Sequence, residues 1–273
     1  MDENPLVSVI VPTRNSDATL SLCLEAIRLQ TYSNLEIIIV DNHSTDGTRE
    51  TASRYGAKTF LKGPERGAQR NHGAEKASGK FLLFLDSDIE ITPKVIEECV
   101  MGLEKDDVQI MVIPELFVGE TFWARCRALE KTCYISKDID NNIEAARFFS
   151  KNVFWKVGGY DETIIGIEDW DLPQRARESG YKQSKINSFM IHHEGKLSLG
   201  KSVWKAFYYG KHSSSYFDKD RSNVFRHVFI SRFVWLKKWR LLTKQPSLMV
   251  GMFFMKKCEF IAAFIGYITS KMN

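Results

Sequence analysis

Hydrophobic positions in the first third of the chain fall into short continuous runs, separated by longer stretches with a helical period. Continuous apolar runs of this length are typical of strands buried on both faces. The runs are Leu6–Val11, Glu36–Val40, Ala57–Leu61 and Phe81–Leu85. The stretches between them predict helices at Ala18–Gln30, Thr48–Tyr55 and Gln69–Ala77. Strands that alternate with helices in this way predict βαβ units and a mainly parallel sheet, which is an α/β fold.

The second half of the chain has a less regular pattern. It predicts, in order, a strand at Val108–Pro114, a helix at Thr121–Ile135, a strand at Arg147–Phe154, a turn at Gly158-Gly159-Tyr160, a helix at Glu168–Gly180 and a last strand at Phe189–Ile191. This last strand leads directly into His192 and His193.

Composition narrows the class of protein. Of the 273 residues, 44% are hydrophobic and 26% are charged, which is enough apolar sequence for a full core and excludes a disordered or collagen-like chain. The five cysteines are scattered and form no CxxC pair, so we expect free thiols in a reducing compartment. The polar start MDENP runs straight into a strand, which predicts no secretory signal and a cytoplasmic location.

Charge divides the chain near Gly195. Residues 196–273 contain 15 Lys and Arg against 3 Asp and Glu, whereas residues 1–195 contain 23 basic and 31 acidic residues. We therefore predict an acidic binding and catalytic domain at 1–195 and a basic, aromatic, amphipathic helical extension at 196–273.

The extension has two patterns of its own. Residues Phe225, Phe229, Phe233, Leu236 and Trp239 follow helical spacing beside Arg226, Lys237, Lys238 and Arg240, which indicates either a helix on an anionic membrane surface or one packed on the catalytic domain. The uncharged stretches Gln245–Met255 and Phe260–Ser270 are each shorter than the ~20 residues of a membrane span. Joining them would place Lys256, Lys257 and Glu259 in the bilayer at ~2.5 kcal/mol or more per charge. We expect peripheral or monotopic attachment through residues 200–273, and the long apolar runs favour lipid over nucleic acid as the partner.

Polar residues gather directly after three of the predicted strands, at Pro12–Asn15, Asp41–Asp46 and Asp86–Asp88. Ligands of open parallel sheets bind at the carboxyl ends of the strands, so these segments form the candidate binding edge. Asp86 and Asp88 could together hold a divalent cation that contacts a diphosphate. The alternative is a turn with two solvated aspartates.

A second acidic cluster, Glu168-Asp169-Trp170-Asp171, opens the predicted helix at Glu168–Gly180. The helix dipole favours carboxylates in a first turn, but a carboxylate at the edge of a cleft can also act as a general base toward a hydroxyl. After the last strand, His192 or His193 could give an imidazole to the same cation or make only a structural hydrogen bond.

The segment GAQRNHG at residues 67–73 opens a helix with residue types that suit a phosphate. The chain has no GxxxxGK[ST] loop, no GxGxxG and no GxSxG. ATPase, dinucleotide-binding and serine-hydrolase functions therefore lose their main support.

Five segments in series resemble family 2 glycosyltransferases, inverting enzymes with the glycosyltransferase A fold. They are VSVIVPTRN, EIIIVDNHSTDGT, GAQRNHGAEKASGKFLLFLDSDIEITP, VGGYDE and EDWDLPQRARESGY, in the family's order and spacing within residues 6–195. The resemblance implies a Rossmann-like, mainly parallel sheet flanked by helices. The chain departs from the pattern at Asn42-His43, where the family commonly has Asp-Gly, and it lacks the QxxRW motif of the processive branch. A single transfer per acceptor is therefore expected.

The resemblance also implies residue roles. Donor contacts would come from Pro12, Arg14, Asn15, Asp41, Asn42, Arg70, Asp86 and Ser87, with Asp41 on the nucleobase. Asp86 and Asp88 would contact the ribose and the metal, and His192 would be a further metal ligand, with His193 as the alternative. Asp169 would deprotonate the acceptor hydroxyl, with Glu168 beside it.

The activity implied by the resemblance is transfer of a sugar from a UDP- or GDP-sugar to a hydroxyl or phosphate of an acceptor. It would proceed with inversion and with Mn²⁺ or Mg²⁺ as cofactor. Membrane attachment would suit a lipid-linked acceptor, such as a polyprenol phosphate, or another glycan. The alternative is a non-catalytic nucleotide-sugar-binding scaffold at the membrane; the presence of DSD, EDWDL and HH together favours the enzyme.

Overall fold

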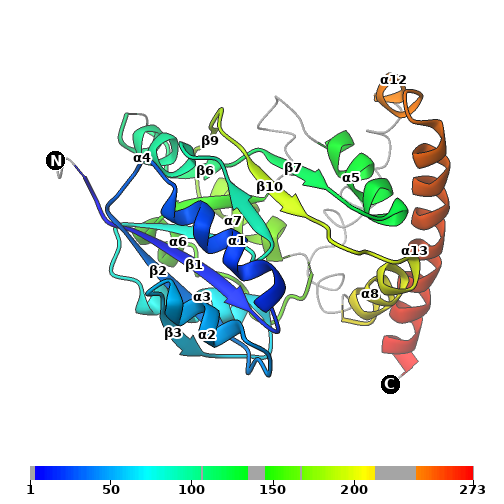
Figure 1. Ribbon diagram of the computed structural model, residues 1–273, viewed down its shortest axis with the longest axis horizontal. Helices are drawn as coiled ribbons and strands as arrows, with labels where there is room; N and C mark the ends of the chain where they lie inside the picture. The colour runs from blue at the N-terminus through cyan, green and yellow to red at the C-terminus, as the bar shows by residue number, and fades with distance from the viewer. Residues whose placement is uncertain (1–3, 106, 135–144, 167, 213–237, 273) are drawn as a thin grey trace. The chain divides into compact units, whose positions relative to one another are not determined.

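The structure is a computed structural model that describes residues 4–105, 107–134, 145–166, 168–212 and 238–272 (Figure 1). The chain divides into two compact units. The first unit contains Met1–Glu115, Asp138–Glu162 and Ile167–His192, and the second contains Leu116–Lys137, Thr163–Gly166 and His193–Asn273. The two-domain division near Gly195 stays a prediction.

The first unit is built on a seven-stranded sheet. In spatial order its strands are β3 (Lys58–Leu61), β2 (Leu35–Asp41), β1 (Val7–Thr13), β4 (Phe81–Phe84), β8 (Ala146–Ser150), β6 (Ile110–Val112) and β9 (Gln183–Lys185). The first four strands are parallel, and β8 is antiparallel to both of its neighbours. The expected α/β fold, with a mainly parallel sheet flanked by helices, is confirmed. Since β4 lies on the side of β1 opposite to β2, the topological switch point lies between β1 and β4.

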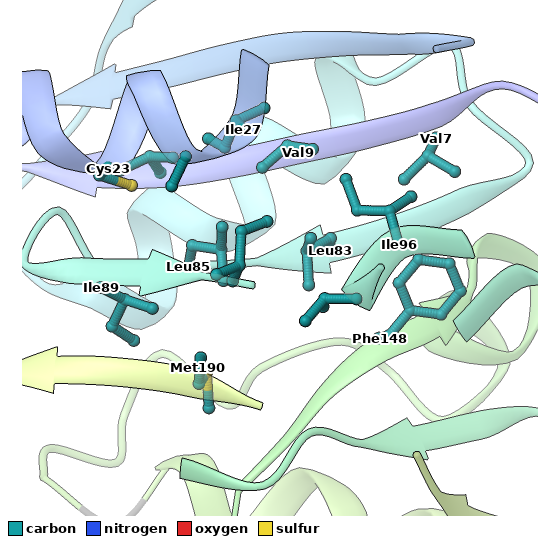
Figure 2. Close-up of a cluster of buried hydrophobic side chains, with 14 of the residues drawn as sticks. Val7, Val9, Cys23, Ile27, Leu83, Leu85, Ile89, Ile96, Phe148 and Met190 are labelled. Carbon is teal, nitrogen blue, oxygen red and sulfur yellow. The ribbon is translucent and has the colours of Figure 1, made fainter. Parts of the chain in front are cut away.

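Helices cover both faces of this sheet. They are α1 (Asp17–Arg28), α2 (Thr48–Arg54), α3 (Arg66–Lys76), α4 (Val95–Lys105), α6 (Lys151–Lys156) and α7 (Glu168–Glu178). Because side chains alternate along a strand, β1 contributes to two cores. Val9 packs with Cys23 and Ile27 of α1 (Figure 2), whereas Ile10 packs in the other core with Leu172 of α7.

Two elements differ from the prediction. A single strand over Arg147–Phe154 is wrong in its second half, because β8 ends at Ser150 and α6 begins at Lys151. The two ends of the run are buried around Phe148 and Phe154, and periodicity over so few residues does not separate a strand from a short helix. The structure also contains β5 (Ile89–Ile91), which pairs antiparallel with β10 (Met190–His193) and places His192 opposite Ile89.

The second unit is mostly helical. Its helices are α5 (Phe122–Tyr134), α8 (Leu199–His212), α12 (Trp239–Leu242) and α13 (Pro246–Met272), and most of β7 (Glu115–Val118) belongs to it. Helix α13 lies against α8 so closely that a Cβ on Gly210 would collide with the backbone of Ala263 (Figure 1). The uncharged stretches Gln245–Met255 and Phe260–Ser270 both lie in α13, apart from Gln245, and so belong to one helix. None of the helices in the described ranges is both long and apolar enough to span a membrane. Most of the helix predicted around Phe225–Trp239 lies outside the described residues.

Candidate active site

The loop after β2 is held by Asp41, which was expected at the nucleobase. Its carboxylate is fully buried, accepts from Thr13 Oγ1 at 2.9 Å, and accepts from the amide and the hydroxyl of Ser44 at 2.8 and 2.5 Å. The neighbouring Asn42 donates from Nδ2 to the carbonyl of Pro64 at 2.7 Å. Both side chains therefore fix the loops at this edge of the sheet.

The loop after β1 turns at Asn15, whose φ of 49° lies in the left-handed region. Asparagine tolerates this region better than most residues because its side chain bonds locally. Here its Oδ1 accepts from the amide of Thr45 at 2.9 Å, while Pro12 is buried and Arg14 is exposed. Across the switch point, Ser87 donates to Ser16 Oγ at 2.9 Å and so ties the β1 and β4 ends together.

Helix α3 carries Arg70 beneath this edge. The helix lies directly on the sheet because Gly73 faces Ile10 and Val40 without room for a Cβ. Gln69 donates from Nε2 to the carbonyls that end β1 and β2, at 3.0 Å to Thr13 and 2.6 Å to Val40. Arg70 is consequently fully buried, with its guanidinium at the ends of the strands.

The Arg70 guanidinium joins the two acidic motifs. Its Nη2 donates to Asp86 Oδ1 at 2.8 Å, and its Nη1 donates to Asp169 Oδ1 at 2.7 Å. The other oxygen of Asp86 lies 3.2 Å from Nη1 of Arg147, which comes from β8. Asp86 is thus held from both sides by arginines, and the DSD and EDWDL motifs meet in one cluster.

These contacts set the protonation of the cluster. Burial disfavours the carboxylate of Asp86, but the charges of Arg147, Arg70 and Arg66 outweigh burial and hold its pKa well below the usual range. Burial also disfavours the carboxylate of Asp169, but the charges of Arg70 and Arg147 outweigh burial and lower its pKa. Both carboxylates are therefore ionised at neutral pH.

Glu168 and Asp169 differ in access. Glu168 has a side chain only 4% exposed; it lies 3.2 Å from Nη2 of Arg66 and 3.8 Å from Nη1 of Arg70. Asp169 is 24% exposed, so it can reach a molecule in solution while still paired with Arg70. Of the two candidate bases, Asp169 has the accessible carboxylate.

On the other side of Asp86, His192 lies between two carboxylates. Its Nε2 is 3.4 Å from Asp88 Oδ2, and its Nδ1 is 2.6 Å from Glu115 Oε1. Burial disfavours the imidazolium, but hydrogen bonds and charges from Asp88 and Glu115 outweigh it and raise the pKa of His192 to about 10. Histidine and Asp88 are thus adjacent, as the prediction of a shared cation requires.

The family of the chain follows from comparison with known proteins. The family model described as glycosyl transferase family 2 matches residues 8–158, more than half of the chain. The chain belongs to glycosyl transferase family 2. Transfer of a sugar is the activity class of that family, and the resemblance drawn from the five segments is confirmed.

Several relatives and solved structures are similar to this glycosyltransferase. Glycosyltransferase AglE of Haloferax volcanii is 27% identical over 241 residues, which cover 82% of this chain and 78% of AglE. A validoxylamine A glucosyltransferase of Streptomyces hygroscopicus subsp. limoneus is 28% identical, over 64% of this chain and 49% of that protein.

Two structures share the fold at low sequence identity. The mannosyltransferase PcManGT of Pyrobaculum calidifontis, in complex with GDP-Man and Mn²⁺, superposes with a TM-score of 0.68 at 16% identity and covers 98% of this chain and 88% of that one. TarS 1–349 of S. aureus, in complex with UDP, has a TM-score of 0.58 at 15% identity, with coverage of 97% and 91%.

Sequence reasoning missed three charged residues of this glycosyltransferase site. They are Arg66, Glu115 and Arg147. Arg66 stands beside the recognised GAQRNHG segment and could have been included with it. No sequence motif marks Arg147 or Glu115, because each is an isolated charged residue in an apolar strand segment. Only the order of the strands brings them to the cluster.

Proposed function

We propose that this glycosyltransferase moves a sugar from a UDP- or GDP-sugar to a hydroxyl or phosphate of an acceptor, in one displacement with inversion. The donor would lie along the ends of β1, β2 and β4, beside Arg14, Asn15 and Ser87. Asp169 takes the proton of an acceptor hydroxyl while the acceptor oxygen bonds to the anomeric carbon. The bond from that carbon to the diphosphate breaks, and the nucleoside diphosphate leaves.

One observation carries this proposal. Arg70 contacts Asp86 and Asp169 with the two Nη atoms of one guanidinium, although Asp169 is 99 residues further along the chain than Arg70. The donor-side carboxylate and the candidate base are therefore fixed on either side of a buried cation. A site that brings a hydroxyl to an anomeric carbon needs this kind of fixed separation between donor and base.

The residues near Asp88 fit a cation that arrives with the nucleotide. Two ligands of an octahedral ion at ~2.1 Å stand roughly 3 Å apart, and Asp88 Oδ2 and His192 Nε2 are 3.4 Å apart. Among the described residues no group of three or more His, Cys, Asp or Glu could hold a metal. Asp88 and His192 would hold Mn²⁺ or Mg²⁺ together with diphosphate oxygens. When bound, the ion would neutralise charge on the leaving diphosphate.

The proposal predicts release of UDP or GDP from one nucleotide sugar in a panel, dependent on Mn²⁺ or Mg²⁺ and abolished by EDTA. Mn²⁺ should bind measurably only when the nucleotide is present, and Asp88→Asn should weaken that binding. Asp107→Asn, a carboxylate exposed on the surface, is the matched control and should bind Mn²⁺ normally. Electron paramagnetic resonance of free Mn²⁺ gives the affinity. Nucleotide-sugar binding without turnover, even with membrane extract as acceptor, would support the non-catalytic scaffold instead.

We further propose that the extension attaches to an anionic membrane surface, which would favour a lipid-linked acceptor. Two of the three charges in the middle of α13, Lys256 and Glu259, support this, because they face the protein. Lys256 Nζ lies 2.8 Å from both Glu130 of α5 and Glu259, and Arg127 of α5 contacts both glutamates. Burial disfavours the Glu130 carboxylate, but Lys256 and Arg127 outweigh it and lower its pKa to about 2. The internal pairing removes the charge penalty for lipid contact at Lys256 and Glu259, and leaves Lys257 as the exposed charge of this segment.

The opposite face of α13 is apolar and exposed. Its stripe, here called the outer face, consists of Val250, Phe254, Ile261, Phe264, Ile265 and Ile268. The exposed charges of this helix are Lys257 and Lys271, and Glu259, the single acidic residue in α8, α12 and α13, is buried. An apolar stripe with only cations beside it suits an anionic lipid surface.

Replacement of Ile261 and Phe264 by Glu in one variant should lower binding to phosphatidylcholine vesicles that contain phosphatidylglycerol. Each side chain contributes ~1.5–3 kcal/mol when buried, so the loss should exceed about tenfold. Leu29→Glu, at an apolar side chain directly after α1 that is 62% exposed, is the control and should bind as the unmodified protein does. Vesicle co-sedimentation measures the effect. Equal binding of both variants would show that the outer face does not contact lipid, and no binding of the unmodified protein would overturn membrane attachment.

A further inference from the structure

Glu115 is a buried carboxylate that the proposed reaction does not use. Its side chain is 9% exposed, and its two oxygens have different partners. Oε1 is 2.6 Å from Nδ1 of His192, and Oε2 is 3.9 Å from Nη2 of Arg147. Since a buried carboxylate is costly unless it is paired, a position between an imidazole and an arginine accounts for its charge and also fixes its orientation.

The backbone brings Glu115 to His192. The amide of Met190 in β10 donates to the carbonyl of Pro114 at 2.8 Å, which ties β10 to the residue before Glu115. On its other side β10 pairs with β5, and His192 faces Ile89, the residue after Asp88. The imidazole is therefore placed with one nitrogen toward Glu115 and the other toward Asp88.

We infer that Glu115 is a positioning residue for the metal-binding imidazole. It accepts the Nδ1 proton of His192, so that Nε2, the ring nitrogen on the Asp88 side, is the one left to bind the ion. A histidine that binds a metal usually donates its other ring N–H to a carboxylate or carbonyl, and this contact orients the ring. The inference rests on the proposed metal-dependent function and adds a residue that the sequence motifs do not contain.

Arg147 gives this contact a second consequence. The same guanidinium lies 3.2 Å from Asp86 and 3.9 Å from Glu115, so it joins the donor-side carboxylate to the carboxylate behind His192. The chain of alternating charges runs from Asp169 through Arg70, Asp86, Arg147 and Glu115 to His192. This cluster therefore fixes the positions of both the candidate base Asp169 and the imidazole of His192.

The test is Glu115→Gln, with Mn²⁺ affinity measured by electron paramagnetic resonance at saturating UDP or GDP. Loss of an outer carboxylate typically weakens metal affinity about 10–100-fold, and we expect a decrease of that size. Nucleotide affinity without metal should not change. The matched control is Glu97→Gln, where a half-buried glutamate outside the site accepts from Thr31 at 2.8 Å. Its Mn²⁺ affinity should equal that of the unmodified protein.

A second measurement does not depend on metal. In ¹⁵N-histidine-labelled protein, with His192→Asn to assign the resonance among the six histidines, the Nδ1 and Nε2 shifts of His192 report its tautomer and charge. Glu115→Gln should change them and Glu97→Gln should not. Glu115→Asp covers the case in which the glutamine variant misfolds, because it keeps a charge for Arg147 but its shorter side chain does not reach Nδ1; it should also weaken Mn²⁺ binding.

Two results separate this inference from the proposed function. If Glu115→Gln and Glu115→Asp bind Mn²⁺ as tightly as the unmodified protein, with unchanged His192 shifts, the inference is overturned and Glu115 only balances Arg147. If the unmodified protein binds no Mn²⁺ with any nucleotide, the metal dependence in the proposed function is wrong. The His192 shifts of the Glu115 variants then decide whether Glu115 positions the imidazole.

Discussion

Asp169→Asn should reduce kcat for sugar transfer by about 10²–10⁴-fold, the contribution typical of a general base. The amide has the same shape as the carboxylate, and its oxygen can still accept from Nη1 of Arg70, now 2.7 Å from Asp169 Oδ1. It cannot accept the proton of the acceptor hydroxyl. Affinity for UDP or GDP should therefore stay as in the unmodified enzyme while turnover is lost. Nucleotide release with saturating acceptor measures kcat, and calorimetric titration measures nucleotide binding.

Asp171→Asn is the matched control for this prediction. The substitution removes the same charge from the same turn of α7, but Asp171 pairs with Arg175 at 2.6 Å and has no contact with Arg70 among those described. Its kcat should remain close to that of the unmodified enzyme. Equal losses of kcat in the two variants would mean that turnover depends on the negative charge at the start of α7 and not on a base at Asp169. Full turnover by Asp169→Asn would place the base elsewhere or indicate a phosphate acceptor, which is already deprotonated.

The sheet edge of the first unit could be predicted from the sequence because its strands are continuous apolar runs. The predicted Glu36–Val40 and Phe81–Leu85 correspond to β2 and β4 within a residue at each end. Since the carboxyl ends of parallel strands share one edge, polar residues after each strand were expected together there. Ser16 and Ser87, which follow β1 and β4, are indeed hydrogen-bonded to each other.

The orientation of the site's charged side chains could not be predicted. Arg70 was expected near the donor, and the sequence did not indicate that it is fully buried and paired with both Asp86 and Asp169. Its helical segment and neighbours suit either arrangement, and pairing depends on which carboxylates the fold brings within reach. For Arg147 the obstacle is topology, because β8 lies beside β4 only through a long-range antiparallel pairing.

The buried face of helix α13 could have been predicted from the sequence. Its buried positions Leu248, Met252, Met255, Glu259, Ala262 and Gly266 recur every three or four residues. That spacing is a single helical stripe, and Glu259 falls on it. A glutamate on an otherwise apolar inner stripe predicts an internal cation partner, and Lys256 and Arg127 are the partners found. Division of the segment at its charges hid this periodicity.

Arg70→Met should destabilise the first unit by about 3–5 kcal/mol, because it buries an apolar side chain in place of the cation shared by the largely buried Asp86 and the partly exposed Asp169. This is a large part of the 5–15 kcal/mol that typically stabilises a folded domain. Hydrogen–deuterium exchange of the β1 and β4 amides measures the effect in this unit alone, which matters for a chain of two units. Lys182→Met is the control: its side chain is 66% exposed and lies 2.9 Å from the exposed Asp107, so the loss should be at most about 1 kcal/mol.

The effect of Arg70→Met should also depend on pH, with a sign fixed by the lowered pKa of Asp86 and Asp169. A carboxylate with a lower pKa in the folded state adds stability at pH values above its unfolded pKa of about 3.9 and loses it as the pH falls. The difference in stability between the two proteins should therefore be complete at neutral pH and shrink below about pH 4. A difference independent of pH would instead indicate that Arg70 stabilises by packing, for example by its position 5.1 Å from the ring of Tyr160.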